Sequence, residues 1–83
     1  MSKLIGEPVK AYVKEKDHVM TAFIWRKRLY RVNRVLSWWR EPADWWHGKE
    51  ICFFVRVETT GDSKGAYELY RLGEQWFLSR VLD

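Results

Sequence analysis

The chain has 83 residues, of which 17% are aromatic and 31% are charged, and its formal net charge at pH 7 is +4. This length allows one domain over residues 1–83 and excludes a deep substrate cleft beside a full core. No apolar run approaches the ~18 residues of a membrane span, and the first six residues lack the apolar region of a secretory signal. Cys52 is the only cysteine, so we expect a cytoplasmic protein without disulfides.

Positive charge is concentrated in the first half of the chain. Residues 1–40 carry ten Lys and Arg against three acids, whereas residues 41–83 carry five against eight. Between Asp17 and Glu41 the chain carries basic residues and no acidic one. We therefore expect positive potential to gather on the segment that these residues form.

The first third of the chain predicts three strands. Residues 9–14 alternate apolar and polar side chains, and a charged connection follows over residues 14–18. Residues 21–26 and 29–32 are predicted to be the two arms of a hairpin. The turn between them, around residues 27–28, contains neither Gly nor Asn, which departs from the favoured two-residue turns.

The middle of the chain is less regular. After Val32 the alternation fails, because Val35 and Leu36 are adjacent and both apolar. This predicts either a bulge that bends the strand or a short helical turn. Residues 40–50, with Pro42 and Gly48, are predicted to be the longest irregular stretch.

The last third predicts three more strands. Residues 51–59 place Ile51, Phe53, Val55 and Val57 on one face, and residues 61–65 turn the chain. A second hairpin is expected from residues 66–71 and 75–82. We therefore predict an all-β domain of six largely meandering antiparallel strands, curled into a small barrel or a strongly bent sheet, of SH3-like or OB-like size. The expected core residues are Trp25, Tyr30, Val55, Leu69, Trp76 and Leu78.

Catalytic and metal-binding patterns are missing from the sequence. The two histidines lie far apart, and there is no Ser/His/Asp set, Gly-rich phosphate loop, HExxH or CxxC motif. His47 lies near Asp44 and Glu50, but neither spacing nor strand context supplies a third metal ligand. We expect no enzyme activity, no metal and no cofactor.

Aromatic and basic residues alternate over residues 25–31 and 38–40. Small barrels bind single-stranded nucleic acid by stacking bases on exposed rings while basic side chains contact the phosphates. The alternative is structural, because tryptophans supply the core of a domain this small and the intervening arginines form the outer side of a strand. The candidate residues for nucleic-acid or partner binding are Arg26, Arg28, Arg31, Arg34, Trp38, Trp39, Arg40, Trp45, Trp46 and Lys49.

Residues 38–49 are expected to be the main interaction surface. Adjacent side chains on a strand point to opposite faces, so the pairs Trp38–Trp39 and Trp45–Trp46 cannot all face one core. The alternative is that Pro42 and Gly48 fold the segment back and that one of the latter two tryptophans plugs an open end of the barrel.

Three motifs carry a resemblance to a known family. Residues 23–32 fit F-x-W-R-x-R-x-Y-x-V, residues 67–70 are Y-E-L-Y, and residues 76–83 fit W-x-L-x-R-V-x-D. Gly65 is separated from Tyr67 by Ala66, one place further than in the shortest form of the pattern. From Val9 onward the chain resembles a family of small uncharacterised bacterial proteins.

This resemblance implies an association with Y-family translesion polymerase homologues and supplies no catalytic residues. The leading hypothesis is a non-catalytic accessory module in bacterial DNA repair or translesion mutagenesis, which contacts a polymerase component or single-stranded DNA. The alternative is a β-barrel adaptor for protein partners, unrelated to DNA. A contiguous positive face would favour nucleic acid, whereas arginines paired with Glu58, Glu68 or Glu74 across the sheet would favour a structural role.

Overall fold

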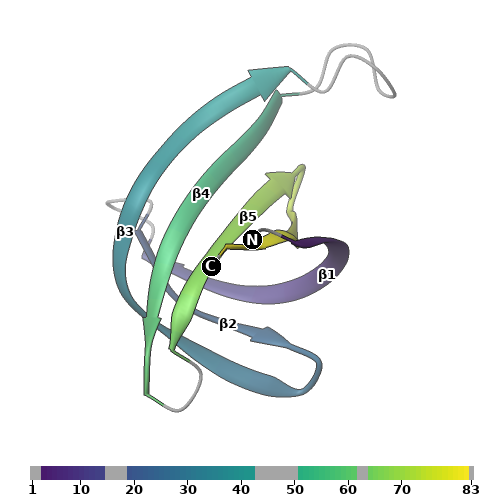
Figure 1. Ribbon diagram of the computed structural model, residues 1–83. Helices are drawn as coiled ribbons and strands as arrows, with labels where there is room; N and C mark the ends of the chain where they lie inside the picture. The colour runs from purple at the N-terminus through teal and green to yellow at the C-terminus, as the bar shows by residue number, and fades with distance from the viewer. Residues whose placement is uncertain (1–2, 15–18, 43–50, 62–63, 83) are drawn as a thin grey trace.

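Six antiparallel strands form a closed barrel in the computed structural model, which describes residues 3–14, 19–42, 51–61 and 64–82. Each strand pairs with the next one in sequence, and the last pairs with the first to close the barrel (Figure 1). The strands are β1 (Lys3–Lys14), β2 (Val19–Trp25), β3 (Arg28–Pro42), β4 (Ile51–Thr60), β5 (Gly65–Leu72) and β6 (Gln75–Leu82). The predicted all-β barrel is therefore confirmed, and closure removes the edge strands of an open sheet.

Strand β1 is longer than the predicted residues 9–14 because a glycine lets it bend. Its first part pairs with β6 and its second part, from Lys10, pairs with β2. The register against β6 shifts between Leu4 and Glu7, and Gly6 in this bulge has a φ of 68°. A residue with a Cβ adopts this backbone conformation at a cost, so Gly6 is what allows the strand to continue through the bend.

Strand β3 spans 15 residues and is interrupted by bulges rather than by a helical turn. Its register against β4 shifts between Val32 and Arg34 and again between Val35 and Ser37. The strand also continues through Arg40 to Pro42, which corrects the predicted start of the irregular stretch. Cross-strand pairing extends β3 and β4 together, and they form a long curved pair that reaches beyond the end of β5 (Figure 1).

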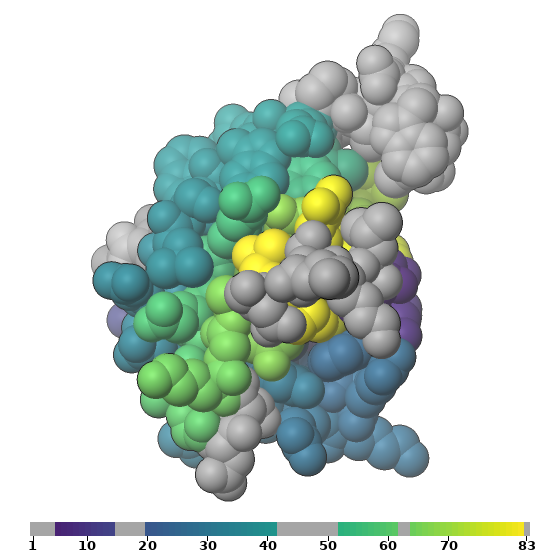
Figure 2. Space-filling view, in the orientation of Figure 1, coloured from purple at the N-terminus to yellow at the C-terminus, as the bar shows by residue number. Residues whose placement is uncertain are grey.

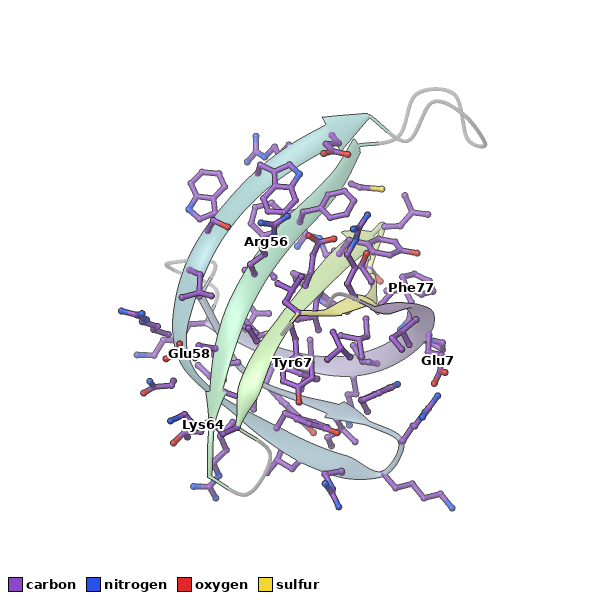
Figure 3. All side chains as sticks on the ribbon, viewed as in Figure 1. Glu7, Arg56, Glu58, Lys64, Tyr67 and Phe77 are labelled. Carbon is purple, nitrogen blue, oxygen red and sulfur yellow. The ribbon has the colours of Figure 1, made fainter. Side chains whose placement is uncertain are left out.

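Aromatic rings from three strands fill the centre of the barrel. Phe23 of β2 stacks on Tyr30 of β3, with ring centroids 4.9 Å apart and planes 4° apart, and Tyr67 of β5 meets both edge-on. Figure 3 shows Tyr67 pointing into the barrel and Glu58 pointing away from it. Five predicted core residues are buried, and the sixth, Trp25, is partly buried against them. The five are Tyr30, Val55, Leu69, Trp76 and Leu78.

Alternation along β4 follows the prediction. Phe53, Val55 and Val57 contribute to the core side, while Arg56 between them is exposed. Burial of β-branched residues on one face of a strand is the pattern that a half-buried sheet requires. The side chain of Ile51, placed on the same face by the sequence, lies outside the described part.

The turn between β2 and β3 consists of Arg26 and Lys27, one residue earlier than predicted. Both have positive φ values, 52° and 65°, as a two-residue hairpin turn of type I′ requires. This conformation costs about 1–2 kcal/mol for a residue with a Cβ. We expect Lys27→Gly to raise the free energy of unfolding by about 1 kcal/mol, since part of the relieved strain is offset by the larger entropy of the unfolded chain.

Urea unfolding of the two proteins measures this change. The matched control is Lys10→Gly, which replaces an exposed lysine of β1 and is expected to lower the stability by about 0.5–1 kcal/mol. An equal loss of stability in both variants would show that the positive φ at Lys27 carries no strain.

A carboxylate on β1 holds the hairpin turn in place. Glu7 accepts hydrogen bonds from the Trp25 indole nitrogen at 3.0 Å and from Arg26 Nε and Nη2 at 3.2 and 2.6 Å. The Arg26 guanidinium carbon also lies 4.6 Å from the centre of the Trp25 ring. A two-point guanidinium contact of this kind fixes orientation as well as charge.

This clamp predicts a pH dependence of stability. The hydrogen bonds from Arg26 and then from Trp25 lower the pKa of Glu7 below its ordinary 4.5 in the folded protein. The contribution to stability is therefore present above the unfolded-state pKa and is lost as pH falls through the lowered pKa. We expect the difference in Tm between the parent and Glu7→Gln to shrink toward zero as pH falls below 4.5.

Thermal unfolding across the acid range measures this difference, with Glu74→Gln as the control for loss of an exposed carboxylate. A difference for Glu7→Gln that stays constant with pH would contradict the assignment.

Candidate functional site

The four arginines of the predicted basic hairpin do not form one free positive face. Arg26 belongs to the clamp with Glu7, and Arg34 Nε lies 3.8 Å from Glu58 Oε1. Arg31 and Arg34 face Thr60 and Glu58 of β4 and share the outer side of the strand. The bulge at residue 33 brings these two arginines onto the same face of the strand. Arg28 pairs with Trp25 at the start of β3.

A second group of residues lines the inward side of four strands, at the end of the barrel where β3 ends and β4 begins. Arg40, Phe53, Arg71 and Trp76 are successive cross-strand partners on β3, β4, β5 and β6. Trp38 lies two residues before Arg40, opposite the core residue Val55, and so points to the same side. We call these five residues the inner row: Trp38, Arg40, Phe53, Arg71 and Trp76.

Exposure changes along the inner row from solvent to core. The Trp38 residue is 62% exposed, whereas Trp76 is 9% exposed. The rings of Trp38 and Phe53 lie 5.8 Å apart, and Phe53 meets Trp76 edge-on at 6.2 Å. The Arg71 guanidinium carbon is 5.8 Å from the centre of each of the rings Phe53 and Trp76. The row therefore has an exposed indole at one end and, further along, one guanidinium, that of Arg71, held against two rings.

The positive charge of the inner row is not neutralised within the described ranges. Arg40 and Arg71 are both exposed, and neither has an acidic partner among the residues whose positions are described. The arginines of the outer wall differ, because Glu58 and Glu68 pair with Arg34, Arg56 and Arg80 across the sheet. By the criterion derived from the sequence, this cross-sheet pairing favours a structural contribution from those three arginines, whereas Arg40 and Arg71 of the inner row have no such pairing within the described residues.

Four further rings, one from each of β3 to β6, lie side by side on the outside of the barrel. The centroid distances are 5.2 Å from Trp39 to Phe54, 5.5 Å from Phe54 to Tyr70 and 5.0 Å from Tyr70 to Phe77. We call these four residues the outer row. The first and last of these pairs are nearly parallel, at 5° and 14°, so the rings occupy each other's faces. The outer row therefore stabilises the sheet through cross-strand contacts.

Burial raises the pKa of the Tyr70 phenol above its ordinary 10.0, and the neighbouring Cys52 adds to this effect. The phenol is thus neutral at physiological pH. Cys52 itself is buried, at 4% exposure.

At the β3 end of the outer row, the Trp39 indole nitrogen donates a hydrogen bond of 2.8 Å to Glu41 Oε1. The space-filling view shows the side chains of β3, β4 and β5 next to one another on this face of the molecule (Figure 2).

The structure brings together part of the predicted binding set. Trp38 and Arg40 share the inner row, and Trp39 lies on the opposite face, as the adjacency of the two tryptophans predicted. Trp45, Trp46 and Lys49 lie outside the described residues, and so does the proposed plug. Sequence reasoning missed Phe53, whose ring lies 5.8 Å from that of Trp38, and Arg71, which pairs with Phe53. The sequence did contain a signal for Arg71, because alternation along β5 puts it on the same face of the strand as the core residue Leu69.

Groups of His, Cys, Asp or Glu that could hold a metal ion are absent from the part of the chain that the structure describes. The same residues include no helix long and apolar enough to cross a membrane.

Comparison with known proteins assigns a family but no activity. No curated protein and no solved structure matches the chain. A family model described as a domain of unknown function, DUF6504, matches residues 1–83. This agrees with the expected membership in an uncharacterised family. The chain therefore belongs to the DUF6504 family.

Proposed function

We propose that this protein is a non-catalytic module that binds single-stranded nucleic acid through the inner row. The observation that carries the proposal is the 62% exposure of Trp38 on the same side of the sheet as Arg40 and Arg71, which have no acidic partner in the described ranges. An exposed indole offers a face for an unpaired base, and stacking contributes about 1–3 kcal/mol per base. The guanidinium groups on the same side of the sheet can contact the phosphates of the strand, which are present whatever its base sequence.

The two aromatic rows differ in what they offer to a base. Rings of the outer row lie against one another and are only partly exposed. In the inner row, Trp38 is largely exposed. Stacking needs a free face, which supports the inner row as the site for a base.

Residues 23–32 and 67–83 resemble proteins associated with Y-family polymerase homologues, and this resemblance supports a role in DNA repair for the proposed binding. We infer that the module acts in bacterial DNA repair or translesion mutagenesis, where it contacts the template strand or a polymerase component. Single-stranded template is the form in which a base is free to stack.

Trp38→Ala tests the proposal. Affinity for an oligothymidylate is expected to fall by about 5- to 150-fold, the equivalent of losing one stacked base. Trp38→Phe is expected to restore part of this loss, because it keeps a ring. Leu29→Ala, at another exposed apolar residue of β3, is the matched control. Binding by Trp38→Ala that equals binding by the parent, with both folded, would refute the inner row as the site.

The role of the two arginines is measured by the salt dependence of the same binding. Arg40→Ser/Arg71→Ser is expected to reduce the slope of log K against log salt by about 1.4, since each phosphate contact to a single strand contributes about 0.7. The control Lys10→Ser/Lys64→Ser removes the same charge from other parts of the barrel. Equal slopes for the two double variants would indicate non-specific attraction only.

A second candidate function is an adaptor for a protein partner. It is favoured by the cross-sheet pairing of Arg34, Arg56 and Arg80 with glutamates, which removes much of the free positive charge from the outer wall. Tryptophan and arginine are also the residues most enriched in interface hot spots. Binding of a protein other than a polymerase homologue that is lost with Trp38→Ala, with no single-stranded DNA binding by the parent even at low salt, would establish this alternative.

A further inference from the structure

A carboxylate is buried on the outer wall of the barrel. Glu68 of β5 is 4% exposed, although it alternates with the core residues Tyr67 and Leu69 and so points outward. A buried carboxylate requires compensating donors. Its exposure is this low because donors from the two neighbouring strands surround it.

Those donors come from β4 on one side and β6 on the other. Arg56 Nε donates to Glu68 Oε1 at 2.9 Å, and Arg80 Nε lies 3.4 Å from Oε2. The Ser79 hydroxyl donates to Oε2 at 3.1 Å. The register between β5 and β6 shifts by one residue here, so that Ser79 and Arg80 both reach the carboxylate. The bulge is thus what completes the shell around Glu68.

Two guanidinium groups face one carboxylate, which leaves a positive charge uncompensated. Glu68 is the only acidic side chain in ion-pair contact with either arginine within the described ranges. The next glutamate on β4, Glu58, is engaged by Arg34 and by the Asn33 amide at 3.3 Å. The excess charge therefore belongs to the Arg56–Arg80 pair.

The two arginines are oriented but remain accessible. Their side chains are 46% and 44% exposed, against 5% for Glu68. Each presents Nε to the carboxylate, and the terminal N–H groups of the guanidinium carry further donors. The Arg56 guanidinium carbon also lies 5.0 Å from the centre of the Trp39 ring, and Figure 3 shows Arg56 beside β4. Contacts of this kind reduce the entropy that a guanidinium loses when it binds a ligand.

We propose that Arg56 and Arg80, oriented by Glu68, form a phosphate-binding site on the outer wall, separate from the inner row. Phosphate oxygens match the planar fork of guanidinium donors. The remaining positive charge favours an anion, and the half-exposed arginines leave room for one to approach from solvent. The bound phosphate group can belong either to the backbone of a nucleic acid or to a free phosphate compound.

Titration of the parent protein, followed by NMR through the arginine Nε–H resonances, tests this site directly. One arm uses inorganic phosphate and the other a base-free deoxyribose-phosphate oligomer, which has no base to stack on Trp38. The Arg56 and Arg80 resonances are expected to shift more than those of Arg28 and Arg31. A response to both probes, or to either alone, supports the site and identifies its source. No preferential shift with either probe would overturn it.

Charge-preserving variants give a second measurement. Arg56→Lys/Arg80→Lys keeps the charges beside Glu68 but removes the planar forks, and its affinity for the responding probe is expected to fall by about fivefold or more. The control is Arg28→Lys/Arg31→Lys, expected to bind as the parent does. Equal affinities of the two variants would overturn the proposal. Because the oligomer lacks bases, the outcome is independent of stacking on Trp38.

Discussion

Replacement of Trp76 by Ala is expected to lower the free energy of unfolding by about 3–5 kcal/mol. Trp76 is 9% exposed and lies between Val9 of β1 and Arg71 of β5. Its ring meets Phe53 edge-on at 6.2 Å. Truncation leaves a cavity where β6 closes the barrel against β1, and the surrounding strands cannot collapse into it without losing their pairing. The loss is a large part of the roughly 5–15 kcal/mol that stabilises a typical domain.

Urea unfolding followed by circular dichroism measures the effect without relying on tryptophan emission. Trp76→Phe is the matched control and is expected to retain most of the stability, because it keeps a ring in contact with Phe53. Trp38→Ala, at the exposed end of the inner row, is expected to cost less than about 1 kcal/mol. Similar losses for Trp76→Ala and Trp38→Ala would contradict the gradient of burial along the row.

Arg56→Met is expected to lower the free energy of unfolding by about 2–3 kcal/mol. The change leaves the Glu68 carboxylate buried with only Arg80 and Ser79 as partners. Removal of one partner from a fully buried pair costs about 3–5 kcal/mol, and the 46% exposure of the Arg56 side chain places this case below that range.

A double variant separates the charge of Glu68 from the packing of Arg56. Arg56→Met/Glu68→Gln is expected to recover most of the loss, because a neutral amide tolerates burial with fewer donors. Thermal and urea unfolding of the single and double variants measure the coupling between the two positions. A loss that is the same with and without Glu68→Gln would show that Arg56 stabilises the sheet by packing on Trp39 alone.

The sequence predicted the candidate site only in part. Trp38 and Arg40 were identified from the adjacency of aromatic and basic residues, which is visible along one strand. Phe53 and Arg71 lie on two other strands, and only the cross-strand register places them in one row with Arg40, on the same side of the sheet as Trp38. Arg26 and Arg34 were chosen with the same reasoning, but the fold brings Glu7 and Glu58 to them from strands distant in sequence.

Local periodicity by itself determined the all-β class, the six strands and five buried core residues, because alternation between two faces depends only on neighbouring positions. The tertiary structure decided the pairing of β1 with β6, the placement of the bulges on β1 and β6, and the burial of Glu68 between two arginines. These features depend on contacts between residues far apart in the chain. Such contacts form only when the sheet closes, and a single strand carries no local signal for them.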